Sequence, residues 1–277
     1  MTYLPGPRER VPDTDHAAVA RCSGGSSGSN QTWMVVTGVE APRPNLPQCW
    51  QDFNDVLSAG IDRVILYGPP GTGKTYAGLN LGVSDTGAWR LVCTEDMTNF
   101  DVTGGFLPDK DGSFKWSDGA AVKAWRGDGI TGGRLVVDEI DKAGGDVFAT
   151  LLAMTDTVDS ATWWNPGTKR IEVPREGFSV VMTTNIENLE ELPAALTDRF
   201  PCSIRINEPH PDSLKALDRE LQEYARKMAD AGDRRISLRQ FYAYSKLRVV
   251  HGDERAASLI FGVRAESFLD AVLVDAV

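Results

Sequence analysis

Eight consecutive residues of the chain have the composition of an anion-binding loop. They are Gly68-Pro69-Pro70-Gly71-Thr72-Gly73-Lys74-Thr75, and they match the pattern G-x-x-x-x-G-K-[ST] at every position. Glycines at these spacings let the backbone curl so that successive N–H groups point at one anion. Lys74 adds a charge toward the β- and γ-phosphates, and Thr75 offers a hydroxyl to Mg²⁺. The loop, together with Tyr76 directly after it, is therefore a candidate site for a nucleoside triphosphate and Mg²⁺.

The residues on either side of this loop predict the elements that present it. Residues 63–67 are an apolar, β-branched run typical of a short strand, and residues 75–81 have helical spacing. A surface turn rich in glycine and proline could match the pattern by chance. The strand–loop–helix context favours the phosphate-binding interpretation.

Two carboxylates follow a second apolar run, at residues 135–137. Asp138 can hold Mg²⁺ from the strand tip through a water molecule. Glu139 can orient and deprotonate a water for in-line attack on the γ-phosphate. An acidic loop after a strand is the alternative, and the upstream phosphate loop favours the catalytic interpretation. Asp141 is expected to cap a helix.

A polar amide and an arginine complete the candidate site. Asn185 ends the apolar run 180–184 and could bond both the attacking water and the γ-phosphate, or could simply occupy a turn. Arg199 follows the helical stretch 192–198, where it could stabilise transition-state charge on the nucleotide of a neighbouring subunit. The alternative for Arg199 is an ion pair at its own helix C-terminus.

Strands and helices alternate between about residues 48 and 208, which predicts an α/β domain with a parallel sheet. The arrangement divides the chain into an arm or linker at 1–47, an α/β nucleotide-binding domain at 48–208 and an all-helical lid at 209–277. Within the arm, residues 23–29 read as a flexible linker and 33–36 as a short strand. The expected strands of the sheet are 63–67, 89–93, 134–137, 179–183 and 203–206. The expected helices are 48–59, 75–81, 118–126, 144–157, 192–198, 214–231, 238–250 and the stretch from 254 onward.

Two stretches interrupt this alternation and predict β-hairpins. Residues 105–116 alternate around an Asp-Gly turn, and residues 161–173 alternate around Asn-Pro-Gly. Both carry large aromatic residues, which could pack on their own hairpin or grip a polypeptide. These residues are Phe106, Phe114, Trp116, Trp163 and Trp164.

Composition limits the class of protein. The formal net charge of −10 argues against a surface that attracts nucleic acid as a whole. No apolar run approaches the length of a membrane span, and the N-terminus does not resemble a secretory signal. Four widely spaced cysteines without a C-x-x-C pair fit a reducing compartment, so we expect a cytoplasmic protein. The histidines are scattered, so no transition-metal site is expected.

The order of these motifs resembles that of the AAA+ ATPases. The segments GPPGTGKT, LVVDEI, TTN and ALTDRF carry the resemblance. The stretches 93–105 and 114–125 and the Trp163/Trp164 hairpin are similar to the MoxR-type branch, which includes the CbbQ/NorQ and GvpN-like ATPases and is related to dynein modules. The resemblance covers residues 48–277.

This resemblance implies a strand order of 5-1-4-3-2, a helical lid and hexameric rings that bind ATP between subunits. It also implies a lid arginine at the phosphates, for which Arg239 is the candidate, although Leu238 stands where relatives often have proline. Arg234 and Arg235 are the competing candidates, and Arg248 is expected at the surface.

Three functions follow from these observations. The first is an ATPase that remodels, activates or assembles a protein partner, since MoxR-type proteins commonly serve partners with von Willebrand factor A domains. The second is a nucleic-acid motor subunit, against which the negative charge counts. The third is a nucleotide-gated structural protein with slow turnover, which the intact pair Asp138 and Glu139 disfavours.

Overall fold

The computed structural model of the chain describes residues 46–232 and 235–275. The predicted arm therefore lies outside the described residues except for Leu46 and Pro47. The predicted linker at 23–29 and strand at 33–36 lie outside them entirely. All elements described below belong to the unit Val36–Val277.

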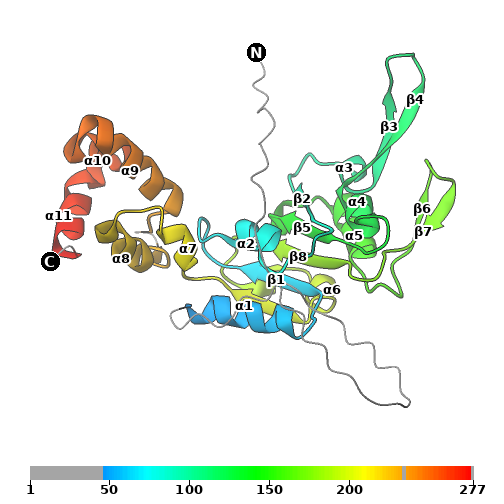
Figure 1. Cartoon of the computed structure of the whole chain (residues 1–277), viewed down its shortest axis with the longest axis horizontal. Coiled ribbons are helices and arrows are strands. Elements are labelled where there is room, and N and C mark those ends of the chain that lie inside the picture. Colours follow the sequence, from blue (N-terminus) through cyan, green and yellow to red (C-terminus); the bar gives the residue numbers. More distant parts are fainter. Residues whose placement is uncertain (1–45, 233–234, 276–277) are drawn as a thin grey trace, which may run out of the picture. The chain divides into compact units, whose positions relative to one another are not determined.

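A five-stranded parallel sheet forms the centre of the α/β part, in the order β2-β5-β8-β1-β9 (Figure 1). Numbered along the chain, this is the predicted order 5-1-4-3-2, which is confirmed. Its strands are β1 (Arg63–Tyr67), β2 (Ala88–Val92), β5 (Arg134–Asp138), β8 (Ser179–Thr183) and β9 (Cys202–Arg205). The central strands are apolar on both faces because helices cover a parallel sheet on both sides.

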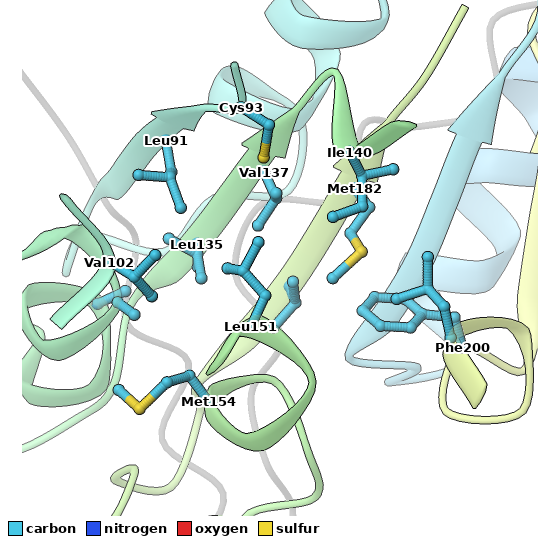
Figure 2. Packing of buried hydrophobic residues seen from close by; sticks show 14 of the residues in the cluster. Leu91, Cys93, Val102, Leu135, Val137, Ile140, Leu151, Met154, Met182 and Phe200 are labelled. Carbon is cyan, nitrogen blue, oxygen red and sulfur yellow. The ribbon is translucent and has the colours of Figure 1, made fainter. Parts of the chain in front are cut away.

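Alternate residues of the strands enter two different cores. On one face, Leu135 and Val137 pack with Leu151 and Met154 of α5, as Figure 2 shows. On the other face, α1 packs its buried side chains against the sheet. The helices of this part are α1 (Gln48–Ser58), α2 (Lys74–Asn80), α3 (Asn99–Thr103), α4 (Ala120–Arg126), α5 (Gly145–Met154) and α6 (Ala194–Thr197).

The short helix α3 was not expected from the sequence. Thr98 and Asp101 form a capping box at its start, in which each side chain bonds the backbone of the other. The spacing of these two residues is a local signal that could have predicted the helix.

Helices alone follow the last strand, as predicted. They are α7 (Pro211–Leu214), α8 (Arg219–Met228), α9 (Leu238–His251), α10 (Asp253–Phe261) and α11 (Ala265–Asp275). They share a separate core in which Phe261 and Phe268 stack with ring centroids 4.0 Å apart. The stretch 214–231, expected as one helix, is divided between α7 and α8.

Arg248, which was expected at the surface, is partly exposed and also has a role in packing. Its side chain is only 21% exposed and joins α9 to α8. Its guanidinium lies 2.6 Å from the Glu220 carboxylate and 3.1 Å from that of Asp218. It also lies over the ring of Tyr244. Arg248 therefore stabilises the packing of the lid helices.

Both predicted hairpins are present, and they lie next to each other (Figure 1). The first pairs β3 (Gly104–Pro108) with β4 (Phe114–Asp118), and the second pairs β6 (Trp163–Asn165) with β7 (Arg170–Glu172). The rings of Trp116 and Trp163 are 6.0 Å apart. A Cβ on Gly167 would come within 2.2 Å of Trp116, so glycine is required for this close approach.

Arg126, the last residue of α4, ties the two hairpins together. Its Nε donates to Glu172 Oε2 at 2.9 Å, and its Nη2 pairs with the other oxygen of the same carboxylate. Its Nη1 pairs with Asp118 of the first hairpin. One guanidinium thus holds both hairpins against α4, with the bidentate geometry that makes such pairs strong.

Replacing Arg126 with alanine should loosen both hairpins at once. We expect amide hydrogen exchange at residues 104–118 and 163–172 to accelerate, and the free energy of unfolding to fall by about 1 kcal/mol, because two carboxylates lose their partner. Hydrogen exchange with mass spectrometry measures the first effect, and urea denaturation measures the second. Lys123→Ala, at an exposed position of the same helix, is the matched control and should change neither. Faster exchange in only one hairpin would contradict the shared role of Arg126.

Within residues 46–232 and 235–275, no helix combines the length and the apolar character that crossing a membrane requires.

Candidate functional site

The loop at residues 68–75 joins the end of β1 to the start of α2. Gly73 directly precedes the helix with φ of 103°, and Gly68 has φ of 112°. Side chains disfavour both conformations, so the glycines of the motif are needed for the curl of the loop. The first N–H groups of any α-helix have no carbonyl partner within the helix. Those at the start of α2 are therefore suited to bind an anion.

Lys74 is buried beneath the loop and contacts the end of β8. Its Nζ donates to the carbonyl oxygens of Gly68 and Pro69, each at 2.8 Å, and to Asn185 Oδ1 at 3.1 Å. Burial, with a smaller contribution from the nearby Arg235, lowers the pKa of Lys74 to about 8 in spite of the opposing charge of Asp138. The structure therefore brings Lys74 and Asn185 together, as expected for residues acting on one phosphate group.

Asp138 lies at the tip of β5 with both carboxylate oxygens engaged. Its Oδ1 accepts a hydrogen bond from Thr75 Oγ1 at 2.8 Å and a second from the hydroxyl of Thr183. Its Oδ2 accepts from Arg90 Nε at 3.1 Å and from Arg90 Nη2. Burial alone would raise the pKa of Asp138, but the hydrogen bonds from Thr183, Arg90 and Thr75 outweigh it and hold the pKa below its ordinary value.

The oxygen atoms of Thr75 and Asp138 fit the requirements of Mg²⁺. The hydroxyl and carboxylate oxygens lie 2.8 Å apart at the edge of the loop. Mg²⁺ prefers hard oxygen ligands and is usually held by one or two carboxylates together with phosphate oxygens and water. The donor set is therefore suitable for a magnesium ion that arrives with a nucleotide.

Glu139 has an unusual backbone conformation directly after β5. Its φ of 59° and ψ of 48° place it in the left-handed region, which costs a non-glycine residue on the order of 1 kcal/mol. The side chain is half-buried and lines the same cleft as Lys74 and Thr75. Strain of this kind often accompanies function, so the conformation is consistent with a role for Glu139 in the site.

The expectation that Asp141 caps a helix was wrong. Asp141 lies within the 3₁₀ helix η1 (Ile140–Lys142), and the next helix, α5, is preceded by Gly144. The Asp141 carboxylate instead accepts a hydrogen bond from Thr184 Oγ1 at 2.6 Å. The Thr184 hydroxyl, which follows β8, thus takes the place of the helix N–H groups that were expected to donate to Asp141.

One cleft of about 580 Å³ collects most of the predicted site residues. Its volume is that of a small-molecule site. The predicted residues that line it are Pro70, Gly71, Gly73, Lys74, Thr75, Tyr76, Asp138, Glu139, Asn185 and Arg239. Gly68, Pro69 and Thr72 belong to the loop without lining this cleft. Thr72 is buried, with its hydroxyl donating to the Pro69 carbonyl oxygen at 3.1 Å.

Part of the cleft lining was not predicted from the sequence. This part is formed by Trp50 of α1 and by His210, Leu238 and Tyr242, which follow the last strand. The indole N–H of Trp50 donates to the Glu208 carbonyl oxygen at 2.9 Å, and its ring meets His210 edge-on at 5.3 Å. Aromatic and aliphatic groups in the lining suit a flat ring system.

Arg90 and Thr183 were also missed, although both contact Asp138. A charged residue within the strand 88–92 was the available signal for Arg90, since an arginine in a sheet strand needs a partner. Thr183 ends an apolar strand, and its proximity to Asp138 follows only from the pairing of β5 with β8.

The candidate arginines have different settings. Arg199 does not line the cleft in the single chain: its Nε lies 3.4 Å from Asp156 Oδ2, and its Nη1 donates to the Ala195 carbonyl oxygen at 2.8 Å. Arg239 is exposed and lines the cleft. Arg235 is near enough to Lys74 to affect its pKa. Arg234 lies outside the described residues.

Comparison with known proteins gives three findings. Residues 63–200 match the family model of the AAA domain (dynein-related subfamily). The protein CbbQ of Hydrogenophilus thermoluteolus is 33% identical over 100 residues, which are 34% of this chain and 33% of CbbQ. A crystal structure from Cytophaga hutchinsonii, described as a candidate ATPase, superimposes with a TM-score of 0.43 and 18% identity, covering 71% of this chain and 57% of that one. The chain thus matches only part of the length of each relative.

Proposed function

Because the chain belongs to the AAA+ ATPases, in the dynein-related and MoxR-type branch, we propose that it hydrolyses ATP in an oligomeric ring to remodel, activate or assemble a protein partner. The observation that carries this proposal is the meeting of Lys74, Thr75, Asp138 and Glu139 in one cleft. Release of phosphate from ATP by the purified full chain, with Mg²⁺ present, tests it. A chain that binds no nucleotide and releases no phosphate would refute it.

The residues of the cleft have separate roles in this proposal. The backbone N–H groups of residues 71–75 and the Lys74 ammonium bind the phosphates, for which Lys74 exchanges its present carbonyl partners. Thr75 and Asp138 would hold Mg²⁺ with their hydroxyl and carboxylate oxygens. The ion would neutralise charge on the β- and γ-phosphate oxygens. Glu139 acts as the base for the attacking water, and Asn185 orients that water against the γ-phosphate.

The nucleotide is proposed to bind between two domains, the α/β domain at 48–208 and the helical lid at 209–277. The presence of Trp50 and Tyr242 in the cleft lining supports binding of the adenine ring in the cleft. Arg239 of the lid would contact the phosphates. The contact between the loop and the lid supports this, because a Cβ on Gly71 would come within 3.0 Å of Ser237. The segment 1–47 is proposed as an arm outside both domains.

The assembly is proposed to be a hexameric ring in which Arg199 acts on the nucleotide of the adjacent subunit. The placement of Arg199 outside its own cleft is consistent with such a role in trans. The ion pair with Asp156 leaves the guanidinium about one-third exposed, so a second subunit can reach it. Two buried cysteines without a disulfide fit the reducing cytoplasm as the location.

The hairpin tips are the proposed contact surface for the protein partner, which could contain a von Willebrand factor A domain. Trp116 and Trp163 pack against each other and stabilise the hairpin pair. Phe114 and Trp164 are instead 67% and 57% exposed, and Phe106 is 52% exposed. The aromatic residues are thus divided between packing and exposure, and only the exposed ones are available to a partner.

Removing the exposed aromatic rings should impair partner binding without affecting nucleotide binding. The double variant Phe114→Ala/Trp164→Ala is made in the Glu139→Gln background. In an ATP-dependent pull-down it should bind about tenfold less partner than Glu139→Gln alone, because aromatic anchors dominate interface energies. Val249→Ala/Val250→Ala on α9 is the matched control, since those apolar side chains are even more exposed than Phe114 and Trp164. Equal retention by both variants would show that the hairpins do not contact the partner.

A further inference from the structure

Arg90 contacts the carboxylate of the proposed magnesium site. It lies on the edge strand β2, which pairs with β5 so that Val92 is opposite Asp138. Residues 90 and 92 face the same side of the sheet, and this brings the long Arg90 side chain to the tip of β5. Both Nε and Nη2 donate to Asp138 Oδ2. Arg90 also lines the cleft that holds Lys74 and Thr75.

The two oxygens of Asp138 have different kinds of partner. Oδ1 is bonded by the neutral hydroxyls of Thr75 and Thr183, whereas Oδ2 is bonded by a cation. The Asp138 side chain is only 8% exposed, and that of Arg90 is 47% exposed. Removing Arg90 would therefore leave a largely buried carboxylate with its charge poorly offset, at the place where the proposed triphosphate brings several more negative charges.

We propose that Arg90 is a positioning residue for Asp138, which fixes the Asp138 carboxylate with Oδ1 toward Thr75 and offsets its charge so that a nucleoside triphosphate can bind before Mg²⁺ arrives. This inference rests on the proposed nucleotide-binding function. Arg90 and Mg²⁺ then have the same effect, because each is a cation that reduces the repulsion between Asp138 and the phosphates. Loss of Arg90 therefore weakens nucleotide binding most when Mg²⁺ is absent.

A surface ion pair of merely structural importance would behave differently. Exposed pairs contribute little, and their loss affects a binding site equally whether or not a metal is present. The Arg90–Asp138 pair has two donors on one oxygen and a carboxylate almost removed from water. Its effect should therefore depend on the charge state of the site.

The dependence of nucleotide affinity on Mg²⁺ tests the inference. The dissociation constant of a fluorescent ATP analogue is measured for the full chain in excess Mg²⁺ and in EDTA. Arg90→Ala should weaken binding in EDTA by at least about tenfold and in Mg²⁺ by less than about threefold, since an unpaired buried charge is costly until a cation replaces its partner. Arg90→Lys should recover part of the loss in EDTA, because it restores the charge with fewer hydrogen bonds.

Two further variants make the test specific. Arg226→Ala removes an arginine that is paired with Glu223 on α8, outside the cleft, and should change neither dissociation constant. In the Asp138→Asn background the carboxylate charge is gone, so adding Arg90→Ala should have no further effect in EDTA. This comparison remains informative if Arg90→Ala alone is poorly folded.

The inference is overturned if Arg90→Ala weakens binding by the same factor with and without Mg²⁺. It is equally overturned if the Arg90→Ala effect persists in the Asp138→Asn background. Failure of the unsubstituted chain to bind the analogue under either condition would refute the proposed function itself, and the Arg90 inference with it. Normal binding by the unsubstituted chain with no effect of Arg90→Ala would refute the Arg90 inference alone.

Discussion

Replacement of Arg199 with alanine is expected to lower ATP turnover by at least about 10³-fold, because an arginine supplied to the transferring phosphoryl group is worth this much or more. Nucleotide affinity should change by less than about threefold, since Arg199 does not line the cleft of its own chain. Steady-state phosphate release measures the first quantity, and titration of a fluorescent ATP analogue measures the second. A loss of affinity equal to the loss of turnover would indicate misfolding or a role within the same chain.

The ion pair of Arg199 with Asp156 provides a matched control. Asp156→Asn removes this pair and leaves the backbone carbonyl of residue 156, which accepts from Arg63, in place. If Arg199 acts on a neighbouring nucleotide, Asp156→Asn should keep most of the turnover because the guanidinium is only released from its intrachain partner. A loss like that of Arg199→Ala would mean that the ion pair itself matters, which is the structural alternative for this residue.

The Glu139→Gln variant should bind ATP as the unsubstituted chain does and hydrolyse it at least about 10²-fold more slowly. The amide keeps the size of the side chain and its position beside Lys74 and Thr75, but it cannot accept the proton of the attacking water. Phosphate release and analogue binding, measured on the same preparation, separate the two effects. Asp141→Asn, two residues away and bonded to Thr184, is the control and should retain activity. Full activity of Glu139→Gln would refute the assigned base.

The parts of the fold that were predicted correctly are those with local signals. The loop at 68–75 follows from its own glycines, and the central strands β1, β5 and β8 follow from short apolar runs that are mostly buried in the structure. The two hairpins follow from their turn residues. The order of the strands was predicted from the family resemblance. It could not be predicted from the strands themselves, because the sequence of one strand does not indicate which distant strand pairs with it.

The parts that were missed depend on contacts between distant residues. Arg90 meets Asp138 only because β2 and β5 are neighbours, and Trp50 reaches the cleft only because α1 packs beside His210. Arg126 bonds Glu172, which lies 46 positions later in the chain and belongs to the second hairpin. Asp141 was misassigned for the same reason, since its partner Thr184 comes from another strand.

Mixing two inactive variants tests most directly whether each catalytic site is completed by a neighbouring chain. In a ring of Arg199→Ala and Glu139→Gln chains, about one quarter of the interfaces join an intact Glu139 to an intact Arg199 if the chains mix at random in equal amounts. We expect phosphate release, which is at least about 10²-fold slower in either variant alone, to return in the mixture toward this fraction of the unsubstituted rate. A mixture that assembles and binds ATP, yet remains as inactive as its two components, would contradict this expectation.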